Sequence, residues 1–511
     1  MLSKIDCFGL IGVDGFNVNV EVDITNGLPT IEIVGLADVS IKESKERVKS
    51  AIKNSGLKYP NSKIVVNLAP ADIKKEGPMY DLAIALGILC ASGQIDYNLK
   101  KDIVFIGELS LDGSLRKVNG ILPLLISARE KGFKKFVIPY ENSVEASFIE
   151  GIEVYCVKTL NETIEFLNNP EKFSKIETSS FEELAKEDFN HLDFCFVKGQ
   201  QSAKRALEIA AAGGHNILMI GPPGSGKTML AKCLPTILPD LSFEEALETT
   251  KIHSVAGVLD NSQGIVSSRP YRSPHHTASI VSLTGGGKNS KPGEISLAHN
   301  GVLFLDELPE YSRQTIEALR QPLEDGVITV ARANQTVTYP ASFMLIASMN
   351  PCPCGHYGSQ SGECKCTEAQ IHKYLSKLSG PLMDRIDIHI EVDNVKYEEL
   401  TDKTSNEEKS EEIKKRVNKA RAIQNERLKS ENKYCNSQMT VKDCNKYCQL
   451  DEDSELLLKT AFEKLNLSAR AHNRILKVAR TIADLAGEEN ILAEHIAEAI
   501  QYRSLDKKYW C

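Results

Sequence analysis

The sequence lacks any apolar run long enough to cross a membrane. A spanning helix needs about 20 consecutive apolar residues, and no stretch of the 511 residues reaches that length. The first residues, MLSKIDCFGLIGVDG, also lack the charged region, apolar segment and cleavage site of a signal peptide. We therefore expect a cytoplasmic protein that does not bind membranes.

An excess of positive charge is also missing. The chain has 61 Lys and Arg residues against 69 Asp and Glu residues, which gives a formal net charge of −8. This balance argues against a surface that is basic all over and coats nucleic acid. A local basic lining, such as the rim of a pore, remains compatible with it.

The cysteines do not form a disulfide framework. There are 13, an odd number, and nine are scattered along the chain, which indicates reduced thiols. The other four follow the pattern C-x-C-x9-C-x-C: Cys352, Cys354, Cys364 and Cys366. Tetrahedral Zn²⁺ accepts four sulfurs and would fasten a loop that is too polar to form a core. Because C-x-C pairs are tighter than the common C-x-x-C, free thiols remain the alternative to a structural zinc.

Hydrophobic periodicity divides the chain into two α/β parts and a helical part. The predicted divisions are 1–167 (α/β), 168–192 (polar linker), 193–395 (α/β), 396–410 (polar linker) and 411–511 (helical). The second α/β part alternates helix and strand around Gly-rich turns, as in βαβ units with a parallel sheet, and it contains the cysteine loop 350–367. In the helical part, Gly487 is expected to end an amphipathic helix.

A phosphate-binding loop is the first motif with a clear chemical meaning. The segment HNILMIGPPGSGKTML gives an apolar strand, the pattern G-x-x-x-x-G-K-T and a helix start. Its glycines let successive backbone N–H groups face phosphate oxygens, while Lys227 supplies positive charge and Thr228 a hydroxyl for Mg²⁺. The predicted nucleotide-binding residues are Gly221, Pro222, Pro223, Gly224, Ser225, Gly226, Lys227, Thr228 and Met229.

Two further apolar strands end in polar residues that complete a predicted site for ATP hydrolysis. In GVLFLDEL, Asp306 is placed for the Mg²⁺ shell and Glu307 for the general base that polarises the attacking water. In FMLIASMN, Asn350 is placed to reach the γ-phosphate and hold that water in line, and a turn asparagine is the alternative. The reaction needs positioned charges more than covalent chemistry, so we expect ATP and Mg²⁺ as cofactors.

These motifs lie in longer blocks that resemble the magnesium-chelatase-like AAA+ ATPases, and within them the ComM/YifB branch. The blocks are FVKGQQSAKRALEIAAAGGHNILMIGPPGSGKT, RPYRSPHHTASIVSLTGGGKNSKPGEISLAHNGVLFLDELPE and MNPCPCG. The resemblance covers essentially the whole chain. It implies a Lon-protease-like (S5-type) α/β domain, an AAA+ P-loop core with a parallel sheet and a C-terminal α-helical lid. It also implies that Phe196–Gln200 pack beside adenine.

The resemblance implies roles for arginines outside the phosphate loop. Arg385 in GPLMDRIDIHIEV is similar to an arginine finger that reaches the γ-phosphate of a neighbouring subunit. Such a finger requires a head-to-tail interface that closes into a ring, which for this family is a homohexamer. The alternative is an arginine paired with Asp384 or Asp387 of its own subunit. Arg470 resembles the second sensor on the lid helix, with Arg474 as the substitute.

The insertion between the two nucleotide motifs resembles the pore or substrate loops of this family. Its basic residues and histidines are Arg269, Arg272, His275, His276, Lys288 and Lys291. The adjacent histidines are also metal candidates, although neighbouring histidines more often point apart or bond locally. Arg332, in a predicted hairpin before the Asn350 strand, is a further candidate DNA contact.

The first 167 residues resemble the proteolytic domain of Lon without its catalytic pair. That enzyme needs a serine after the Gly-Pro of KEGPMYD and a lysine after a later Gly, and this chain has Met79 and Leu122 there. Lys117 is too far from the expected register to replace the lysine. Without an activated nucleophile no acyl-enzyme forms, so we expect no peptidase activity but a ring-forming or DNA-guiding platform.

The leading hypothesis is therefore a hexameric ATP-driven DNA motor. Through the family resemblance, its task would be branch migration of recombination intermediates during natural transformation, on single-stranded or branched DNA passing the ring channel. The alternative is the motor subunit of a metal-insertion complex of the magnesium chelatase type. The chelatase motor lacks a Lon-like domain, and the D-x-S-x-S site of its partner is not found in this sequence. We therefore expect no tetrapyrrole.

Overall fold

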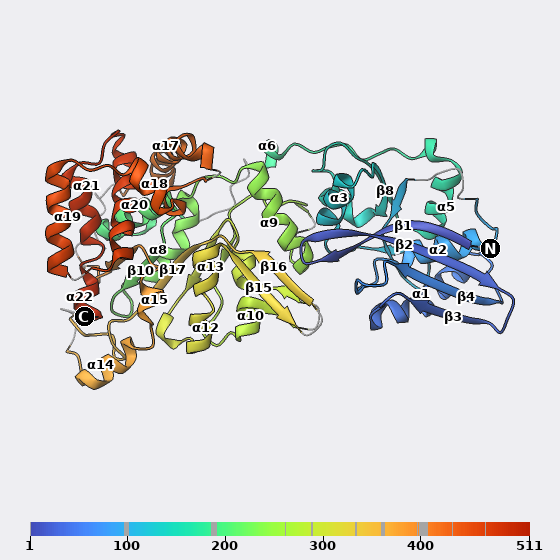
Figure 1. Cartoon of the computed structure of the whole chain (residues 1–511), viewed down its shortest axis with the longest axis horizontal. Helices are drawn as coiled ribbons and strands as arrows, with labels where there is room; N and C mark the ends of the chain where they lie inside the picture. Colours follow the sequence, from blue (N-terminus) through green and yellow to red (C-terminus); the bar gives the residue numbers. More distant parts are fainter. Residues whose placement is uncertain are drawn as a thin grey trace.

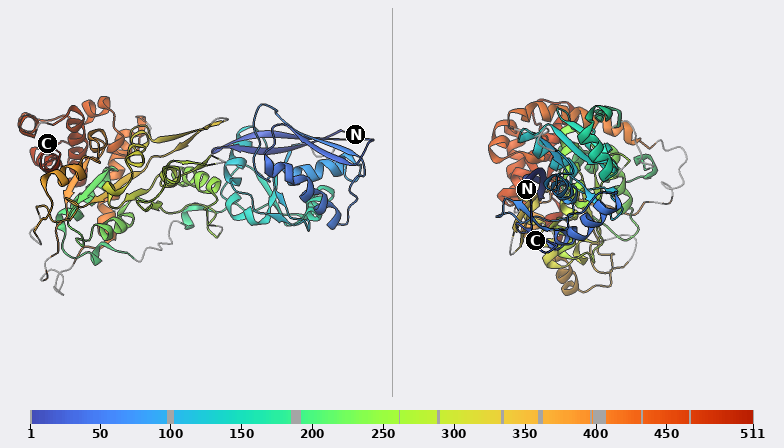
Figure 2. Two further views of the ribbon diagram at one scale, coloured as in Figure 1. Left: turned by 90° about the horizontal axis from the view of Figure 1, so that it is seen from below. Right: turned by 90° about the vertical axis from the view of Figure 1, so that its right-hand side faces the viewer.

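The computed structural model describes most of the chain and is elongated, with the two termini near its opposite ends (Figures 1 and 2). The described residues are 2–96, 102–184, 192–260, 262–287, 290–332, 335–358, 363–395, 397, 407–431, 433–465 and 467–510. The N-terminal α/β part occupies one end, the P-loop part the middle and the helical part the other end (Figure 1). No helix among the described residues has the length and apolar character to cross a membrane.

The N-terminal part is built on a mixed seven-stranded sheet in the order β3-β4-β2-β1-β5-β8-β9. Its strands are β1 (Leu2–Ile11), β2 (Asp14–Thr25), β3 (Thr30–Val34), β4 (Lys63–Ala69), β5 (Ile103–Phe105), β8 (Lys135–Pro139) and β9 (Glu153–Val157). Its other elements are α1 (Val39–Asn54), α2 (Asp81–Ala91), α3 (Ile121–Glu130), α4 (Ser143–Ala146), α5 (Leu160–Asn168) and the two-residue strands β6 (Glu108–Leu109) and β7 (Leu115–Arg116). Every residue of α2 is buried, so this helix forms the centre of the domain core.

The central part contains a five-stranded parallel sheet in the order β11-β14-β17-β10-β18. The strands are β10 (Ile217–Ile220), β11 (Tyr271–Arg272), β14 (Val302–Leu305), β17 (Met344–Met349) and β18 (Ile388–Glu391). β10, β14 and β17 are buried throughout, as expected for parallel strands that helices cover on both faces. Because all five run in one direction, their carboxyl ends meet at one edge, where ligands bind in such sheets.

Short helices and hairpins surround this sheet. The helices are α7 (Gln201–Gly213), α8 (Lys227–Cys233), α9 (Phe243–Ala256), α10 (Ile280–Thr284), α11 (Glu294–Leu297), α12 (Arg313–Glu317), α13 (Arg320–Asp325), α14 (Glu368–Leu375) and α15 (Gly380–Met383). The hairpins pair β12 (Gly285–Gly286) with β13 (Lys291–Pro292), and β15 (Val327–Arg332) with β16 (Gln335–Pro340). A short helix, α6 (Phe181–Leu184), lies in the stretch expected to be a linker.

The C-terminal part is helical, as predicted. Its helices are α17 (Ser410–Leu428), α18 (Val441–Tyr447), α19 (Glu452–Leu465), α20 (Ala469–Ala486), α21 (Ala493–Gln501) and α22 (Leu505–Tyr509). α20 ends at Gly487, whose φ of 80° is in the left-handed region that glycine favours, which confirms the predicted helix end. α22 returns to the central sheet, where the Asp506 carboxylate lies 2.6 Å from His389 Nδ1 on β18. By its contacts, the last helix therefore belongs to the central part.

The N-terminal part is fastened to the central part by a buried carboxyl group. Glu145 of α4 accepts hydrogen bonds from the Ser254 hydroxyl of α9 and, at 3.1 Å, from the backbone N–H of Leu122. Burial raises the pKa of this carboxyl, although these two hydrogen bonds oppose the shift. Leu122 is fully buried and Met79 nearly so. The position where a Lon-type lysine was sought is thus enclosed at the contact between α3 and α9.

Candidate nucleotide site

The phosphate loop joins the end of β10 to the start of α8. Gly224 and Gly226 have φ values of 79° and 88°, which side-chain-bearing residues rarely adopt. Gly221 is required for a different reason, because a Cβ there would lie 2.1 Å from the carbonyl oxygen of Val392. The Gly221 N–H donates to the carbonyl of Met349 at 3.2 Å. The loop is therefore fixed between the ends of β17 and β18.

Lys227 lies inside the turn. Its ammonium donates to the carbonyls of Gly221 (2.8 Å) and Pro222 (2.7 Å), and the side chain is almost fully buried. Burial lowers the pKa of Lys227 to about 8, against the opposing effect of the carboxylates of Asp306 and Glu307. The charge is thus held ready for phosphate oxygens in a place with little water.

The predicted Mg²⁺ ligands lie in direct contact. The Thr228 hydroxyl donates to Asp306 Oδ2 at 2.9 Å, although the two residues are 78 positions apart. A hydroxyl and a carboxylate at the end of a phosphate loop suit Mg²⁺, which binds few protein oxygens and keeps several waters. The other oxygen of Asp306 accepts from the hydroxyl of Ser348 on β17. These residues therefore fit the ion that the sequence predicted.

The backbone around Glu307 is held in an unusual conformation. Its φ of 53° is in the left-handed region, and its N–H donates to Asp306 Oδ1 (3.1 Å) and to the Ser348 hydroxyl (3.3 Å). The side chain is half exposed, and Oε2 lies 3.6 Å from Nδ1 of His276. The sequence did not identify Ser348 and His276 as partners of Asp306 and Glu307. Ser348 could have been found, because a hydroxyl inside a fully buried strand requires a partner.

Two further predicted segments lie beside the phosphate loop. Asn350 directly follows Met349, whose carbonyl accepts from Gly221, so it is placed next to the loop. In the segment Phe196–Gln200, the Gln200 amide donates to the carbonyl of Ser225 at 3.3 Å and to that of Asp393. The adenine-side segment and the phosphate loop are therefore neighbours.

Arg385 lies at the opposite edge of the sheet, just before β18 begins. Its guanidinium pairs with Glu324 of α13 and donates to the Pro381 carbonyl at 2.7 Å. The two aspartates considered from the sequence have other partners, since Asp387 pairs with Arg474 and Asp384 lies 3.8 Å from Arg470. The in-chain partner of Arg385 is therefore Glu324.

A cleft of about 880 Å³ opens beside Arg385. The charged groups that line it include Glu324, Arg385, Asp387, Arg470, Arg474 and Lys477. Burial, followed by repulsion from Arg320, Arg470 and Arg474, lowers the pKa of Arg385. Lys227 and Arg385 lie beyond opposite ends of the sheet strands, and β10 alone spans about 13 Å at 3.3 Å per residue. The arginines of the cleft are thus separated from the phosphate loop of their own chain by the length of the strands.

The insertion differs from the expected set of exposed substrate contacts. Arg269 is largely buried and bonds to Glu245 (2.9 Å), while Arg272 pairs with Glu294 at 2.6 Å. Their guanidinium groups thus hold the insertion to α9 and α11, and a pore or substrate role of the insertion stays a prediction. The rings of His275 and His276 lie 4.1 Å apart, and neither belongs to a metal-type group among the described residues. Lys291 Nζ lies 3.5 Å from the Ala256 carbonyl, whereas Lys288 and the side chain of Arg332 lie outside the described residues.

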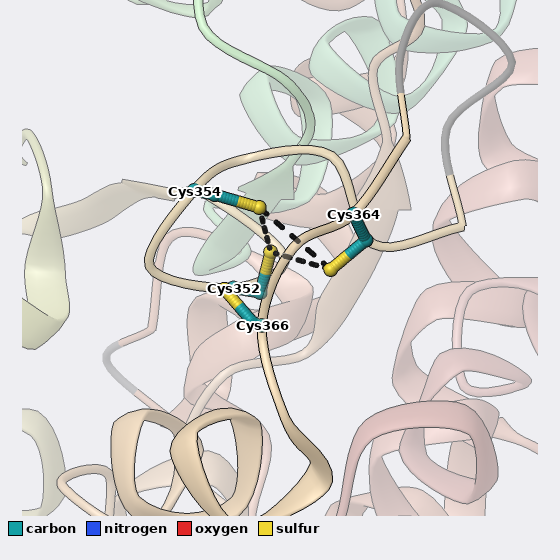
Figure 3. Close-up of side chains that lie close together, drawn as sticks. All are labelled: Cys352, Cys354, Cys364 and Cys366. Atoms are coloured by element: carbon teal, nitrogen blue, oxygen red, sulfur yellow. Dashed lines mark hydrogen bonds between the residues drawn. The ribbon is translucent and has the colours of Figure 1, made fainter.

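The four clustered cysteines converge as a metal site would require (Figure 3). Sγ of Cys352 lies 3.4 Å from that of Cys354 and 3.7 Å from that of Cys364, and all four sulfurs lie within 4.8 Å of one another. A tetrahedral zinc with Zn–S bonds of 2.3 Å needs sulfurs about 3.8 Å apart. Backbone N–H groups of His356 and Lys365 lower the pKa of the Cys354 thiol to about 6, which favours a thiolate. The donor set therefore fits zinc.

The loop between these cysteines touches the phosphate loop. Gly355 has a φ of 83°, and a Cβ there would lie 2.5 Å from Cδ of Pro223. On its other side, the ring centroid of Tyr357 lies 6.5 Å from that of Tyr509 on α22. The hydroxyl of Tyr509 donates to Glu391 at the end of β18 at 2.7 Å. The cysteine loop thus contacts the phosphate loop on one side and α22 on the other.

Comparison with known proteins accounts for nearly the whole chain. The family model described as magnesium chelatase, subunit ChlI, matches residues 193–400. The model described as subunit ChlI of Mg-chelatase matches residues 20–142, and the model of the ChlI C-terminal part matches residues 407–503. Competence protein ComM of Haemophilus influenzae is 45% identical over 97% of this chain and 96% of its own. YifB of Escherichia coli is 42% identical over 99% and 98%. Lon protease 2 of Bacillus subtilis is 34% identical over 29% and 28%, which confirms the Lon-like likeness.

Proposed function

Because this chain belongs to the ComM/YifB family of magnesium-chelatase-like AAA+ ATPases, we propose that it is a hexameric ATP-driven motor that moves branched DNA. The observation that carries the proposal is the separation of Lys227 from Arg385 across the sheet. A finger that is separated from its own phosphate loop in this way completes a site only on a neighbouring subunit. Repetition of that heterologous contact closes a ring.

The proposed roles of the side chains are supported by their positions. Lys227 and the N–H groups of the phosphate loop bind and orient the β- and γ-phosphates. Thr228 and Asp306 would hold Mg²⁺, which when bound would neutralise charge on the phosphates. Glu307 accepts the proton of the attacking water, and the Asp306–Ser348 contacts fix its backbone. Asn350 orients the water, and Arg385 of the neighbouring subunit stabilises the charge that develops on the transferred phosphoryl group. Arg470, with its exposed side chain, joins Arg385 there as the second sensor.

The DNA task is proposed from the relative that is named a competence protein. We infer branch migration of recombination intermediates during natural transformation, with DNA bound by lysines and arginines that face the ring channel. Binding should weaken steeply between about 50 and 200 mM salt, because phosphate contacts release counterions. The N-terminal part is proposed as a platform in the ring. We also propose that Cys352, Cys354, Cys364 and Cys366 bind a structural zinc.

The descriptions of the matching family models, which name magnesium chelatase, support a second candidate function: the motor subunit of a metal-insertion complex. A branch-migration assay on a synthetic three- or four-way junction separates the two. The DNA motor moves the junction with ATP, and Glu307→Gln binds ATP and DNA but moves nothing. A chelatase-type motor leaves the junction unchanged, and this outcome would overturn the DNA proposal.

The shared site is tested by mixing two inactive variants. Lys227→Ala subunits retain an intact finger, and Arg385→Ala subunits retain an intact phosphate loop. Mixed rings should recover ATP turnover, because some sites then combine the intact halves. Absence of recovery, at concentrations where both variants assemble, would contradict hydrolysis in trans.

A further inference from the structure

A buried polar hub surrounds Asp387, two residues after the proposed finger. Asp387 is 4% exposed and accepts hydrogen bonds from Arg474 of α20 and, at 3.1 Å, from the backbone N–H of Asn216. Nδ1 of His215 lies 3.4 Å from the same carboxylate. Burial opposes ionisation, yet Arg474 and then His215 hold the pKa of Asp387 below its ordinary value. The Asp387 carboxylate is therefore held by two separate parts of the fold, the segment just before β10 and helix α20.

The same two parts hold the backbone of Arg385. The carbonyl of Arg385 accepts from the amide of Asn216 at 3.1 Å and from the guanidinium of Arg474 at 3.2 Å. By contrast, the guanidinium of Arg385, itself only 9% exposed, is held by the Pro381 carbonyl at 2.7 Å and by Glu324, whose side chain is 58% exposed. The finger thus has a fixed base and a tip held by a solvent-accessible partner that phosphate oxygens can replace.

The hub also reaches further along the lid helix. Nε2 of His215 lies 2.8 Å from the Thr481 hydroxyl, two turns after Arg474 on α20. The space between them admits no side chain, because a Cβ on Gly213 would lie 2.2 Å from His215 and 2.6 Å from Thr481. Such close packing leaves α20 little freedom to move without moving the start of β10.

We propose that Asp387 and Arg474 are positioning residues that set the direction of Arg385 and connect it to the nucleotide site of their own chain. The connection runs through β10, which begins at the hub and ends in the phosphate loop. A change at the phosphate loop on binding ATP would reach the base of the finger through four buried residues. The proposal rests on the proposed action of Arg385 on a neighbouring subunit. It also distinguishes the two candidate sensors, since Arg474 is occupied inside the chain and Arg470 is 62% exposed.

The test uses Arg474→Gln in the full-length protein, with Lys477→Gln as the matched control. Lys477 lies one turn further on α20, lines the same cleft and donates to the Ser437 carbonyl at 2.8 Å rather than to the hub. We expect Arg474→Gln to bind a fluorescent ATP analogue normally while ATP turnover falls at least tenfold. Adding Lys227→Ala subunits should restore turnover, as it does for Arg385→Ala. Lys477→Gln should stay within about twofold of the unchanged protein.

Four further results decide between the possibilities. If Arg385→Ala recovers with Lys227→Ala and Arg474→Gln does not, the hub inference is overturned while the proposed function stands. If neither recovers, the proposed function itself fails. Loss of ATP binding in Arg474→Gln would show a merely structural role and would also overturn the inference. The double variant Arg385→Ala/Arg474→Gln should be no slower than Arg385→Ala alone, because residues that act through one group are not additive.

Discussion

Replacing Gly355 with alanine tests whether the cysteine loop is part of the nucleotide site. The new Cβ would lie 2.5 Å from Cδ of Pro223 and 3.3 Å from its Cγ. A contact below 3.0 Å must be relieved by movement, and the proline ring is rigid and belongs to the phosphate loop itself. Overpacking of this kind typically costs 1–3 kcal/mol, and about 1.4 kcal/mol equals a tenfold change in affinity. We therefore expect ATP to bind about tenfold more weakly.

Gly358 supplies the matched control, because it lies in the same loop and shares the same backbone constraint. Its φ is 71°, and a Cβ there would lie 3.6 Å from Lys508 Nζ, an ordinary contact. Each alanine carries the left-handed penalty of about 1–2 kcal/mol, so both variants should lose stability in urea, and Gly355→Ala should lose more because of its overpacking against Pro223. Only Gly355→Ala should weaken a fluorescent ATP analogue in anisotropy titrations. Equal affinities for the two variants would refute the idea that the cysteine loop supports the phosphate loop.

Three further predictions concern metal, pH and the finger. We expect elemental analysis to find zinc in the unchanged protein and not in Cys364→Ser. If the ion is present at 100 times its Kd, its loss should lower the stability by about 2.7 kcal/mol and Tm by roughly 5–10 °C. Unchanged metal content would contradict the site. Because the pKa of Lys227 is about 8, its ammonium is mostly charged at pH 7 and about half charged at pH 8. ATP affinity should therefore begin to fall near pH 8 and approach a tenfold loss per unit above it, as anisotropy from pH 7 to 9.5 would measure. A constant affinity up to pH 9.5 would show that the lysine charge is not needed. Glu324→Gln should raise ATP turnover severalfold, since it removes the charged group that competes with phosphate oxygens for the largely buried guanidinium of Arg385, and a decrease would show that Glu324 assists catalysis.

The sequence was sufficient for features defined by short segments. The phosphate loop, Asp306 and the end of α20 at Gly487 depend on residues that are neighbours in the chain, so pattern and spacing predict them. The α/β class and the helical C-terminal part follow from periodicity in the same way.

Features that depend on distant partners could not be predicted. Arg269 was expected among the residues of a pore or substrate loop. Nothing in the sequence shows that it pairs with Glu245, 24 positions away. Glu324 and Arg385 are 61 positions apart, and the contact of Gly355 with Pro223 spans more than 130. Ser348 is the exception, because a lone hydroxyl in a buried strand was visible and its need for a partner could have been inferred.

The burial of Leu122 limits what mutation could restore in the N-terminal part. A lysine there would stand at the contact between α3 and α9, where Leu122 is fully buried and its backbone N–H bonds to the buried Glu145. The two mutations that would nominally rebuild a serine–lysine protease therefore cannot do so while the ATPase part stays attached.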